Sequence, residues 1–222
     1  MAQSKETKNT IEHKAKDEKK GLRKAKAVLR EILFLAVLVL AVLSARASLA
    51  DHYYVPSGSM RPTVEEGDHL VVNKLAFGLR IPRTHHYLLS RANPERGDVV
   101  VLSSPEDGTV LLKRVVAIPG DEIYVDSRGR LHLNGATVET YEEDEWTYEL
   151  LGRTPYTVRL TTRPIEPYGP KNIPENYYLL LGDNRGESQD GRNFGLVHRD
   201  AIIGRGIAIY WRSGRLTWQP FD

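Results

Sequence analysis

Val-Leu-Leu-Lys-Arg-Val-Val-Ala-Ile, residues 110–118, is the stretch of sequence that decides the fold class. Its β-branched residues and leucines predict a strand. Because successive side chains of a strand point to opposite faces, Lys113 and Arg114 lie on different faces. Either one of these cations faces an apolar surface, or the segment is an edge strand whose charges discourage aggregation.

Short apolar segments separated by turn residues extend this pattern on both sides. They are typical of a mostly β domain, whose chain spans residues 51–222. Residues 139–174 are acidic and then proline-bearing, with weakly bounded strands at 146–151 and 156–161, so we expect an insertion or subdomain there. The better-defined strands are predicted at 98–103, 109–118, 123–125, 131–133, 177–181, 201–211 and 216–218.

The N-terminal fifty residues have a different composition. Residues 1–30 form a basic, polar tail, and every residue from Ile32 to Leu43 is apolar. A buried helix and a cleaved signal peptide both fit parts of this pattern, but an uncleaved transmembrane helix at 31–50 is favoured. The lysine bias places the tail in the cytoplasm and residues 51–222 on the extracytoplasmic side of the membrane.

Overall composition narrows the classes of chemistry. The formal net charge of +2 gives no reason to expect a nucleic-acid partner, and the absence of cysteine excludes disulfides, thiolate metal sites and a cysteine nucleophile. We expect no cofactor and no metal. The loop at 180–192 is rich in oxygen ligands but lacks the spacing of an EF-hand calcium loop.

A serine between two prolines is the first catalytic candidate. In Pro-Ser-Gly-Ser-Met-Arg-Pro-Thr, residues 56–63, the prolines stiffen the backbone and Gly58 permits close approaches, as an exposed nucleophile requires. A surface turn explains the same residues, so the serine needs a base to decide its role. Among the histidines, His198 near Asp200 is the best candidate base, and a solvated histidine is the simpler reading.

Lysine is the alternative base, since Ser-Lys pairs replace the histidine triad in some hydrolases. A lysine with a pKa near 10.4 is almost always charged at pH 7, and only burial lowers that pKa toward about 7–8. The base must therefore sit in an apolar strand, which makes Lys113 the candidate.

Four segments together resemble the bacterial type I signal peptidases (leader peptidases), which are Ser-Lys serine peptidases. The resemblance runs from the apolar segment to near the C-terminus and is weakest at 139–174. It implies coiled antiparallel β-sheets behind one N-terminal transmembrane helix. The segments that carry it are PSGSMRPT at 56–63, RGDVVV at 96–101, LKRVVAIPGD at 112–121 and GDNR at 182–185, continuing to Asp190 and Arg192.

The resemblance implies roles for individual residues. Ser59 attacks the scissile carbonyl and Lys113 accepts its proton, while the Ser57 hydroxyl and the Ser59 N–H form the oxyanion hole. The implied supporting set is Ser188, which orients Lys113, Asp190 paired with Arg192, and Asp183 paired with Arg114. The implied substrate-binding residues are Val55, Met60, Val64 and Leu111.

The implied substrates are preproteins in the lipid bilayer of the bacterial cytoplasmic membrane, cut after Ala-X-Ala-like sites by a monomeric enzyme. Gly186-Glu187 stand where the family usually has Asp-Asn, and Gly191 replaces a usual Ser. Three alternative functions are compatible with part of these sequence features. They are a peptidase dedicated to one pilin or conjugation protein, a self-cleaving repressor, and a non-catalytic anchored β domain that binds a partner.

Overall fold

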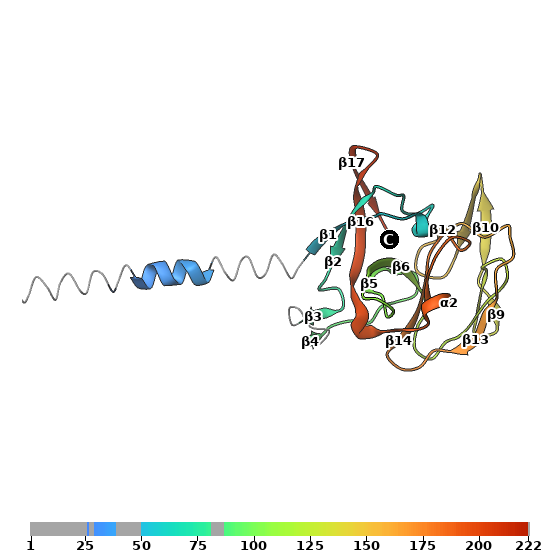
Figure 1. Cartoon of the computed structure of the whole chain (residues 1–222), viewed down its shortest axis with the longest axis horizontal. Coiled ribbons are helices and arrows are strands. Elements are labelled where there is room, and N and C mark those ends of the chain that lie inside the picture. Colours follow the sequence, from blue (N-terminus) through green and yellow to red (C-terminus); the bar gives the residue numbers. More distant parts are fainter. Residues whose placement is uncertain (1–25, 27–28, 39–49, 81–86, 222) are drawn as a thin grey trace, which may run out of the picture. The chain divides into compact units, whose positions relative to one another are not determined.

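The computed structural model describes residues 26, 29–38, 50–80 and 87–221, and it divides the chain into two units, Met1–Ala47 and Ser48–Asp222 (Figure 1). The first unit contains a helix at residues 29–38 with exposed apolar side chains that include Leu33 and Phe34. Within the described ranges, no helix has both the length and the apolar character needed to cross a bilayer. The predicted anchor at 31–50 lies partly outside these ranges, because residues 39–49 are not described.

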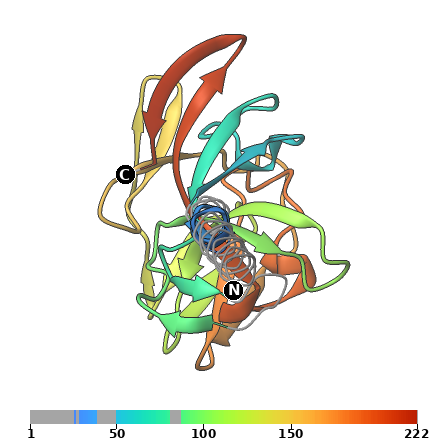
Figure 2. The same ribbon diagram turned by 90° about the vertical axis from the view of Figure 1, so that its left-hand side faces the viewer.

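The second unit is mostly β, which confirms the predicted fold class for this part of the chain. Its largest sheet is antiparallel throughout, in the order β1-β2-β16-β5-β6-β14-β15, and β17 pairs with β16 as a long hairpin (Figure 2). The bounds are β1 (Ala50–Tyr54), β2 (His69–Asn73), β5 (Val99–Ser103), β6 (Val110–Ala117), β14 (Tyr177–Leu181), β15 (Val197–His198), β16 (Ile202–Arg212) and β17 (Arg215–Pro220).

Three smaller sheets complete the described strands of this unit. One has the order β13-β7-β8-β9, another β10-β11-β12, and the last pairs β3 with β4. The strand bounds are β3 (Gly78–Arg80), β4 (Tyr87–Ser90), β7 (Glu122–Val125), β8 (Leu131–Leu133), β9 (Ala136–Thr137), β10 (Thr140–Glu143), β11 (Trp146–Glu149), β12 (Tyr156–Val158) and β13 (Tyr168–Asn172). The short helical elements are η1 (Gly58–Met60), α2 (Gly191–Phe194) and η2 (Arg199–Ala201).

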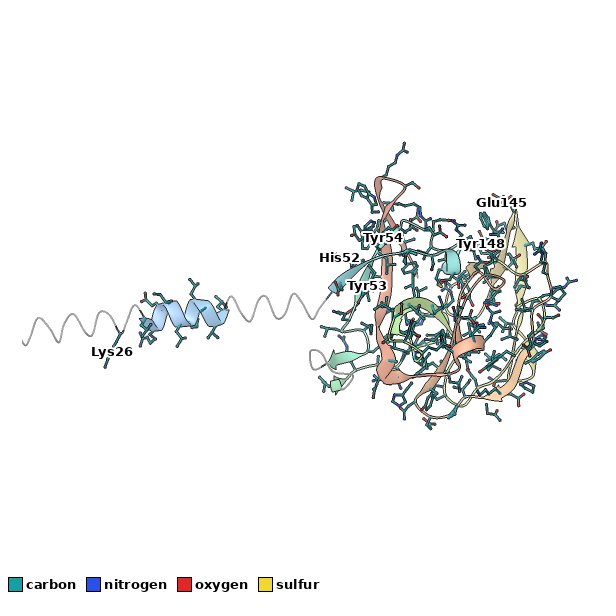
Figure 3. All side chains as sticks on the ribbon, in the orientation of Figure 1. Lys26, His52, Tyr53, Tyr54, Glu145 and Tyr148 are labelled. Carbon is teal, nitrogen blue, oxygen red and sulfur yellow. The ribbon has the colours of Figure 1, made fainter. Side chains whose placement is uncertain are left out.

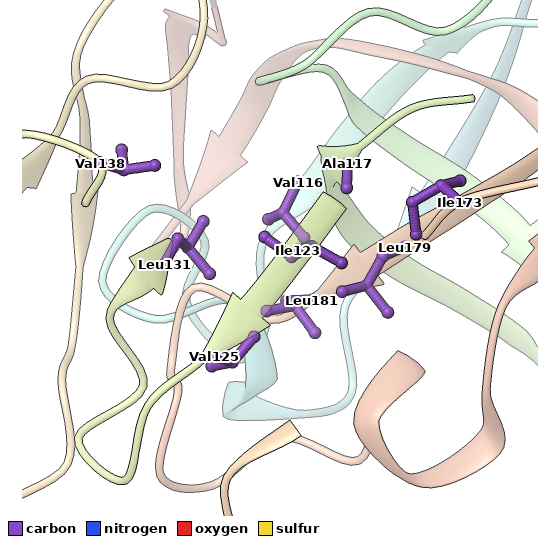
Figure 4. Packing of buried hydrophobic residues seen from close by; sticks show 9 residues of the cluster. All are labelled: Val116, Ala117, Ile123, Val125, Leu131, Val138, Ile173, Leu179 and Leu181. Atoms are coloured by element: carbon purple, nitrogen blue, oxygen red, sulfur yellow. The ribbon is translucent and has the colours of Figure 1, made fainter. Parts of the chain in front are cut away.

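The central strands of the large sheet are covered on both faces. On β5, Val99 and Val101 pack into one core cluster while Val100 and Leu102 pack into another, as the two-residue period of a strand requires. On β14, Leu179 and Leu181 pack against Ile123 of β7 in a third cluster (Figure 4), and the intervening Leu180 turns to the opposite side. Burial of both faces explains why these strands read as continuous apolar runs.

The region 139–174 does not form a single subdomain. β10, β11 and β12 make their own sheet, whose β10–β11 hairpin carries Glu145 and Tyr148 (Figure 3), whereas β13 returns to pair with β7. β1 already begins at Ala50, the last residue of the predicted anchor. The sequence missed β1 and β2, because Asp51, His52 and His69 interrupt the apolar pattern of these strands.

Candidate active site

The turn that carries Ser59 is a short 3-10 helix anchored by a buried side chain. Met60 is only 1% exposed and packs with Val55 and Val64 in one core cluster. The Arg61 N–H donates to the Gly58 carbonyl over 3.1 Å, which closes the turn. A side chain at position 58 would meet only the mobile ends of the Glu66 and Arg61 side chains, the nearest atom being Glu66 Oε1 at 2.9 Å. The result is a serine held on a rigid turn.

Lys113 comes to Ser59 from the middle of β6. Its Nζ donates to Ser59 Oγ over 2.8 Å and to the Leu112 carbonyl over 3.0 Å. Ser57 Oγ also lies 3.5 Å from Ser59 Oγ. The fold thus brings Ser57 and Ser59 into one cluster with Lys113, although Ser59 and Lys113 are 54 positions apart in the chain.

The Lys113 ammonium is desolvated without a carboxylate in contact. The residue is 3% exposed, and no ion pair to Lys113 occurs within the described part of the chain. Burial lowers the pKa of Lys113 from 10.5 to about 8, although the charges of Asp190 and Asp183 oppose that shift. Since desolvation disfavours the charged form, a substantial fraction of Lys113 is neutral near pH 8.

Arg114, the next residue on β6, is buried on the other face with a full set of partners. Its Nε and terminal N–H groups donate to both carboxylate oxygens of Asp183, each over 2.8 Å. A further N–H group donates to the Gly97 carbonyl over 2.7 Å, and the guanidinium lies 3.8 Å from the centre of the Tyr156 ring. Thr63 donates to Asp183 over 2.6 Å, which ties the serine turn to this ion pair.

Asp190 and Arg192 form the second predicted ion pair, at the start of α2. Arg192 donates to both carboxylate oxygens of Asp190, each over 2.8 Å. Asp190 also caps α2 and accepts a hydrogen bond of 3.0 Å from the Gly182 N–H. The pair is therefore tied to the residue that follows β14, through the Gly182 N–H.

The hydrogen bond expected from Ser188 to Lys113 is not formed in this structure. Ser188 Oγ is buried and has no hydrogen-bond partner among the described residues, while Lys113 uses the Leu112 carbonyl. A side chain on Gly182 would collide with both Ser188 Oγ and the Ser59 carbonyl. Ser188 thus lies against the serine turn, in space that only a glycine at position 182 leaves open.

An apolar cavity of about 280 Å³ opens beside Ser59 and Lys113. Of the predicted substrate-binding residues, Val55, Met60 and Leu111 line it, whereas Val64 is fully buried in the core cluster behind Met60. The sequence did not single out Tyr53, Tyr54, Leu70 and Val101, which also line the cavity; the two tyrosines lie on β1 (Figure 3).

The two alternative sites considered from the sequence, a histidine base and a metal site, lack comparable surroundings. His198 Nδ1 lies 3.6 Å from Asp200 Oδ2, and both side chains are exposed on the surface. In the ranges that the structure describes, no group of three or more His, Asp or Glu side chains is arranged to hold a metal ion. In the Ser59–Lys113 cluster, by contrast, a buried lysine amine lies within hydrogen-bond distance of a serine hydroxyl.

Comparison with known proteins matches this chain to a family. Residues 28–211 match the model of the family described as signal peptidase, peptidase S26. The chain belongs to the signal peptidase family. It is therefore a peptidase.

Individual relatives agree with this assignment. The chain is 33% identical over 203 residues to signal peptidase I of Pseudomonas fluorescens and 34% identical over 203 residues to that of Pseudomonas aeruginosa. In both comparisons the match covers 81% of this chain and 72% of the relative. A crystal structure of a signal peptidase I from Enterococcus faecalis covers 52% of this chain and 98% of its own, at 24% identity and a TM-score of 0.36.

This S26 peptidase fills the space around its unusual glycines. A side chain at Gly191 would meet Leu179 Cδ1 at 2.7 Å, and one at Gly186 would meet Thr161 Cβ at 3.0 Å. At both positions neighbouring side chains already occupy the space that a Cβ atom would need.

The signal peptidase fold also buries an ion pair that the sequence did not reveal. Arg185 donates to Glu149 Oε1 over 2.6 Å and to the Gly129 carbonyl over 2.6 Å, and Tyr156 donates to the same Glu149 carboxylate. Burial is the main reason why the pKa of Tyr156 is raised well above 10, which keeps it a neutral donor. Glu149 follows an acidic, exposed hairpin in the sequence, so only the fold distinguishes it from a solvated glutamate.

Proposed function

We propose that this S26 peptidase is a membrane-bound serine endopeptidase that removes N-terminal signal peptides from exported preproteins, with Ser59 as nucleophile and Lys113 as general base. The observation that carries the proposal is the 2.8 Å separation between a buried lysine amine and a serine hydroxyl. The Pseudomonas relatives are signal peptidases I, which supports the substrate class.

The proposed chemistry begins with neutral Lys113. Its amine takes the proton from Ser59 Oγ as that oxygen attacks the scissile carbonyl carbon, and a tetrahedral oxyanion forms. When the intermediate collapses, the carbon–nitrogen bond breaks and the Lys113 ammonium donates its proton to the leaving amine. Lys113 then removes a proton from water, whose oxygen attacks the carbonyl carbon of the acyl-serine ester. The bond between that carbon and Ser59 Oγ breaks, and the Lys113 ammonium returns its proton to Ser59 Oγ. This step releases the signal peptide with a new carboxylate and restores the neutral amine.

The oxyanion needs donors that are in place before the reaction. The Ser57 hydroxyl and the Ser59 backbone N–H are the proposed pair, supported by the 3.5 Å separation of the two serine oxygens. Removing one donor of such a pair typically costs about 10²–10³ in rate. Asp183 with Arg114 and Asp190 with Arg192 are proposed to hold the dyad in place, with Ser188 packed against the serine turn.

The cavity beside the dyad supports a preference for small apolar side chains. The cavity has a volume of about 280 Å³, which more than one substrate side chain would have to share. Val55, Met60 and Leu111 are among the residues that line it. We propose that it accepts the alanines of an Ala-X-Ala-like site and excludes larger residues.

Attachment to the membrane is a further part of the proposal. The apolar run from Ile32 to Leu43 supports an anchor at 31–50 in the bacterial cytoplasmic membrane, with the peptidase unit outside the cytoplasm. Signal peptides in the same bilayer would then meet the enzyme at a raised effective concentration, even if it acts as a monomer.

The test is cleavage of a preprotein with an Ala-X-Ala site by the detergent-solubilised full chain, beside Ser59→Ala and Lys113→Met. The proposal expects one cut at that site by the parent and at least a 10³-fold loss in both variants, with unchanged circular dichroism. Activity that persists in Ser59→Ala would assign the nucleophile elsewhere, and a folded parent that cuts no preprotein would favour a dedicated peptidase or a binding domain.

A further inference from the structure

We propose that Asn184 is a positioning residue that aims the Ser59 N–H at the oxyanion. The inference rests on the proposed function, because it needs Ser59 as the nucleophile. Asn184 follows β14 in the Gly-Asp-Asn-Arg segment, and it is 2% exposed. Neither its type nor its place in a charged loop suggested this role, which depends on contacts across the fold.

Asn184 holds two consecutive carbonyls of the serine turn. Its backbone N–H donates to the Ser59 carbonyl over 3.1 Å, and its side-chain Nδ2 donates to the Gly58 carbonyl over 3.2 Å. The Gly58 carbonyl also accepts the 3.1 Å hydrogen bond from the Arg61 N–H. Two donors from different segments therefore fix the direction of this one carbonyl.

The Gly58 carbonyl and the Ser59 N–H belong to the same peptide plane. In a trans peptide they point in opposite directions, so a donor that fixes the carbonyl also fixes the N–H. Asn184 approaches the carbonyl side, which directs the N–H away from it. Because oxyanion stabilisation depends on donors that need no reorganisation during the reaction, this constraint acts on the transition state.

The side-chain amide is itself held in one orientation. Its Nδ2 also donates to Glu187 Oε2 over 3.2 Å, and the Glu187 N–H donates to the Asn184 carbonyl over 3.1 Å. Both partners of Nδ2, the Gly58 carbonyl and the Glu187 carboxylate, are acceptors. The amide nitrogen, not the amide oxygen, must therefore face Gly58. Glu187, one of the residues by which this chain departs from the family pattern, thus supports the Asn184 amide.

The experiment compares Asn184→Ala with the parent full chain, using preprotein cleavage and two peptide ligands. One ligand is an Ala-X-Ala peptide aldehyde, to whose carbonyl carbon Ser59 Oγ adds so that the carbonyl oxygen becomes the oxyanion. The other is the matched peptide alcohol, which cannot form this adduct. We expect kcat to fall about 10- to 100-fold, below the 10²–10³ for complete loss of a donor, with KM within threefold.

Aldehyde affinity should fall by the same factor as kcat, and alcohol affinity should change less than threefold. A purely structural role would weaken both ligands equally, and that result, or an unchanged kcat, would overturn the proposal. Asn134→Ala is the matched control, since it removes side-chain hydrogen bonds to Glu122 and Asp121 in the four-stranded sheet and should lower Tm without changing kcat.

Asn184→Asp provides the second variant if Asn184→Ala does not fold. It keeps the shape of the side chain but presents an acceptor to the Gly58 carbonyl, so the same loss of kcat and of aldehyde affinity is expected. If Asn184→Asp kept the parental kcat and the parental aldehyde affinity, the proposed role of Asn184 would be contradicted. Parallel assays of Ser59→Ala separate the two hypotheses, because activity in that variant would refute the nucleophile rather than the role of Asn184.

Discussion

Lys113 and Arg114 are neighbours on β6, and both are buried, yet their side chains meet opposite electrostatic surroundings. Arg114 is 2% exposed and forms a bidentate ion pair with Asp183. Lys113 is 3% exposed, and among the described residues it donates to the Ser59 hydroxyl and a backbone carbonyl. The difference teaches that burial alone does not define a catalytic cation, because a paired guanidinium stays charged whereas an unpaired amine can become neutral.

Lys113→Arg is expected to show the largest effect. Arginine keeps the positive charge but cannot lose its proton in the physiological range, so the proposed general base is lost. Cleavage of the Ala-X-Ala preprotein should fall at least 10³-fold, equivalent to about 4 kcal/mol in the activation barrier. Single-turnover kinetics on the folded variant measure this loss, and retention of a tenth of the parental rate would show that Lys113 acts as a charge rather than a base.

Asp183→Asn is expected to cause the largest loss of stability. It leaves the Arg114 guanidinium buried without its counter-charge, which typically costs about 3–5 kcal/mol. Urea unfolding followed by circular dichroism measures the change in the free energy of unfolding. The double variant Arg114→Met with Asp183→Asn should recover part of the loss, and an undiminished loss there would mean that the unpaired charge is not its cause.

Lys113→Met is expected to stabilise the protein at pH 7. Since folding lowers the pKa of Lys113 from 10.5 to about 8, the native state binds this proton less tightly than the unfolded state. The cost to the parent is therefore complete below pH 8, at up to about 3 kcal/mol, and it disappears as the pH rises from 8 to 10.5.

Urea unfolding of both proteins at pH 7 and pH 10 tests this difference. The advantage of Lys113→Met should be largest at pH 7 and should shrink at pH 10. If the gain in the free energy of unfolding were equal at pH 7 and pH 10, its cause would be packing of the methionine side chain and not loss of the proton.

The pH dependence of kcat/KM should show the smallest shift. Because only neutral Lys113 accepts a proton, kcat/KM should rise with pH through an apparent pKa of about 8. The negative charge of Asp190 raises this pKa, so Asp190→Asn should move the midpoint to lower pH. Steady-state assays over pH 6 to 10 measure the midpoint, and a shift to higher pH would contradict the electrostatic role of Asp190.

Each strand predicted from the sequence has a counterpart in the structure, and the bounds agree well for strands with continuous apolar patterns. β14 has the predicted bounds, Tyr177–Leu181, and β6 and β16 begin and end within one residue of the prediction. The missed strands are β1, β2, β3, β4, β9, β10, β13 and β15, which are short or carry polar and aromatic residues. For some of them the register depends on pairing with distant segments, as for β13 with β7 and β15 with β14, and a local pattern contains no information on those partners.

The residues of the candidate site also fall into two groups, those that could be predicted from the sequence and those that could not. The serine between prolines and the lysine in an apolar strand could be selected from local sequence because their chemistry imposes local requirements. Asn184 could not be selected, since a buried asparagine that donates to Gly58 looks like any turn asparagine in sequence. Glu149 was missed for the same reason, because its burial follows from how the loop after β14, which carries Arg185, packs against β11.

By itself, the sequence predicted a mostly β unit, because strand periodicity is a local property. Its four motifs, through their resemblance to the signal peptidases, selected Ser59 and Lys113 as the candidate catalytic pair. The tertiary structure alone decided that Lys113 reaches Ser59 rather than a carboxylate, that Ser188 packs against the serine turn, and that Asn184 holds the Gly58 carbonyl. Hydrogen-bond geometry depends on distances of a few tenths of an ångström between segments far apart in the chain, and only the packed fold sets those distances.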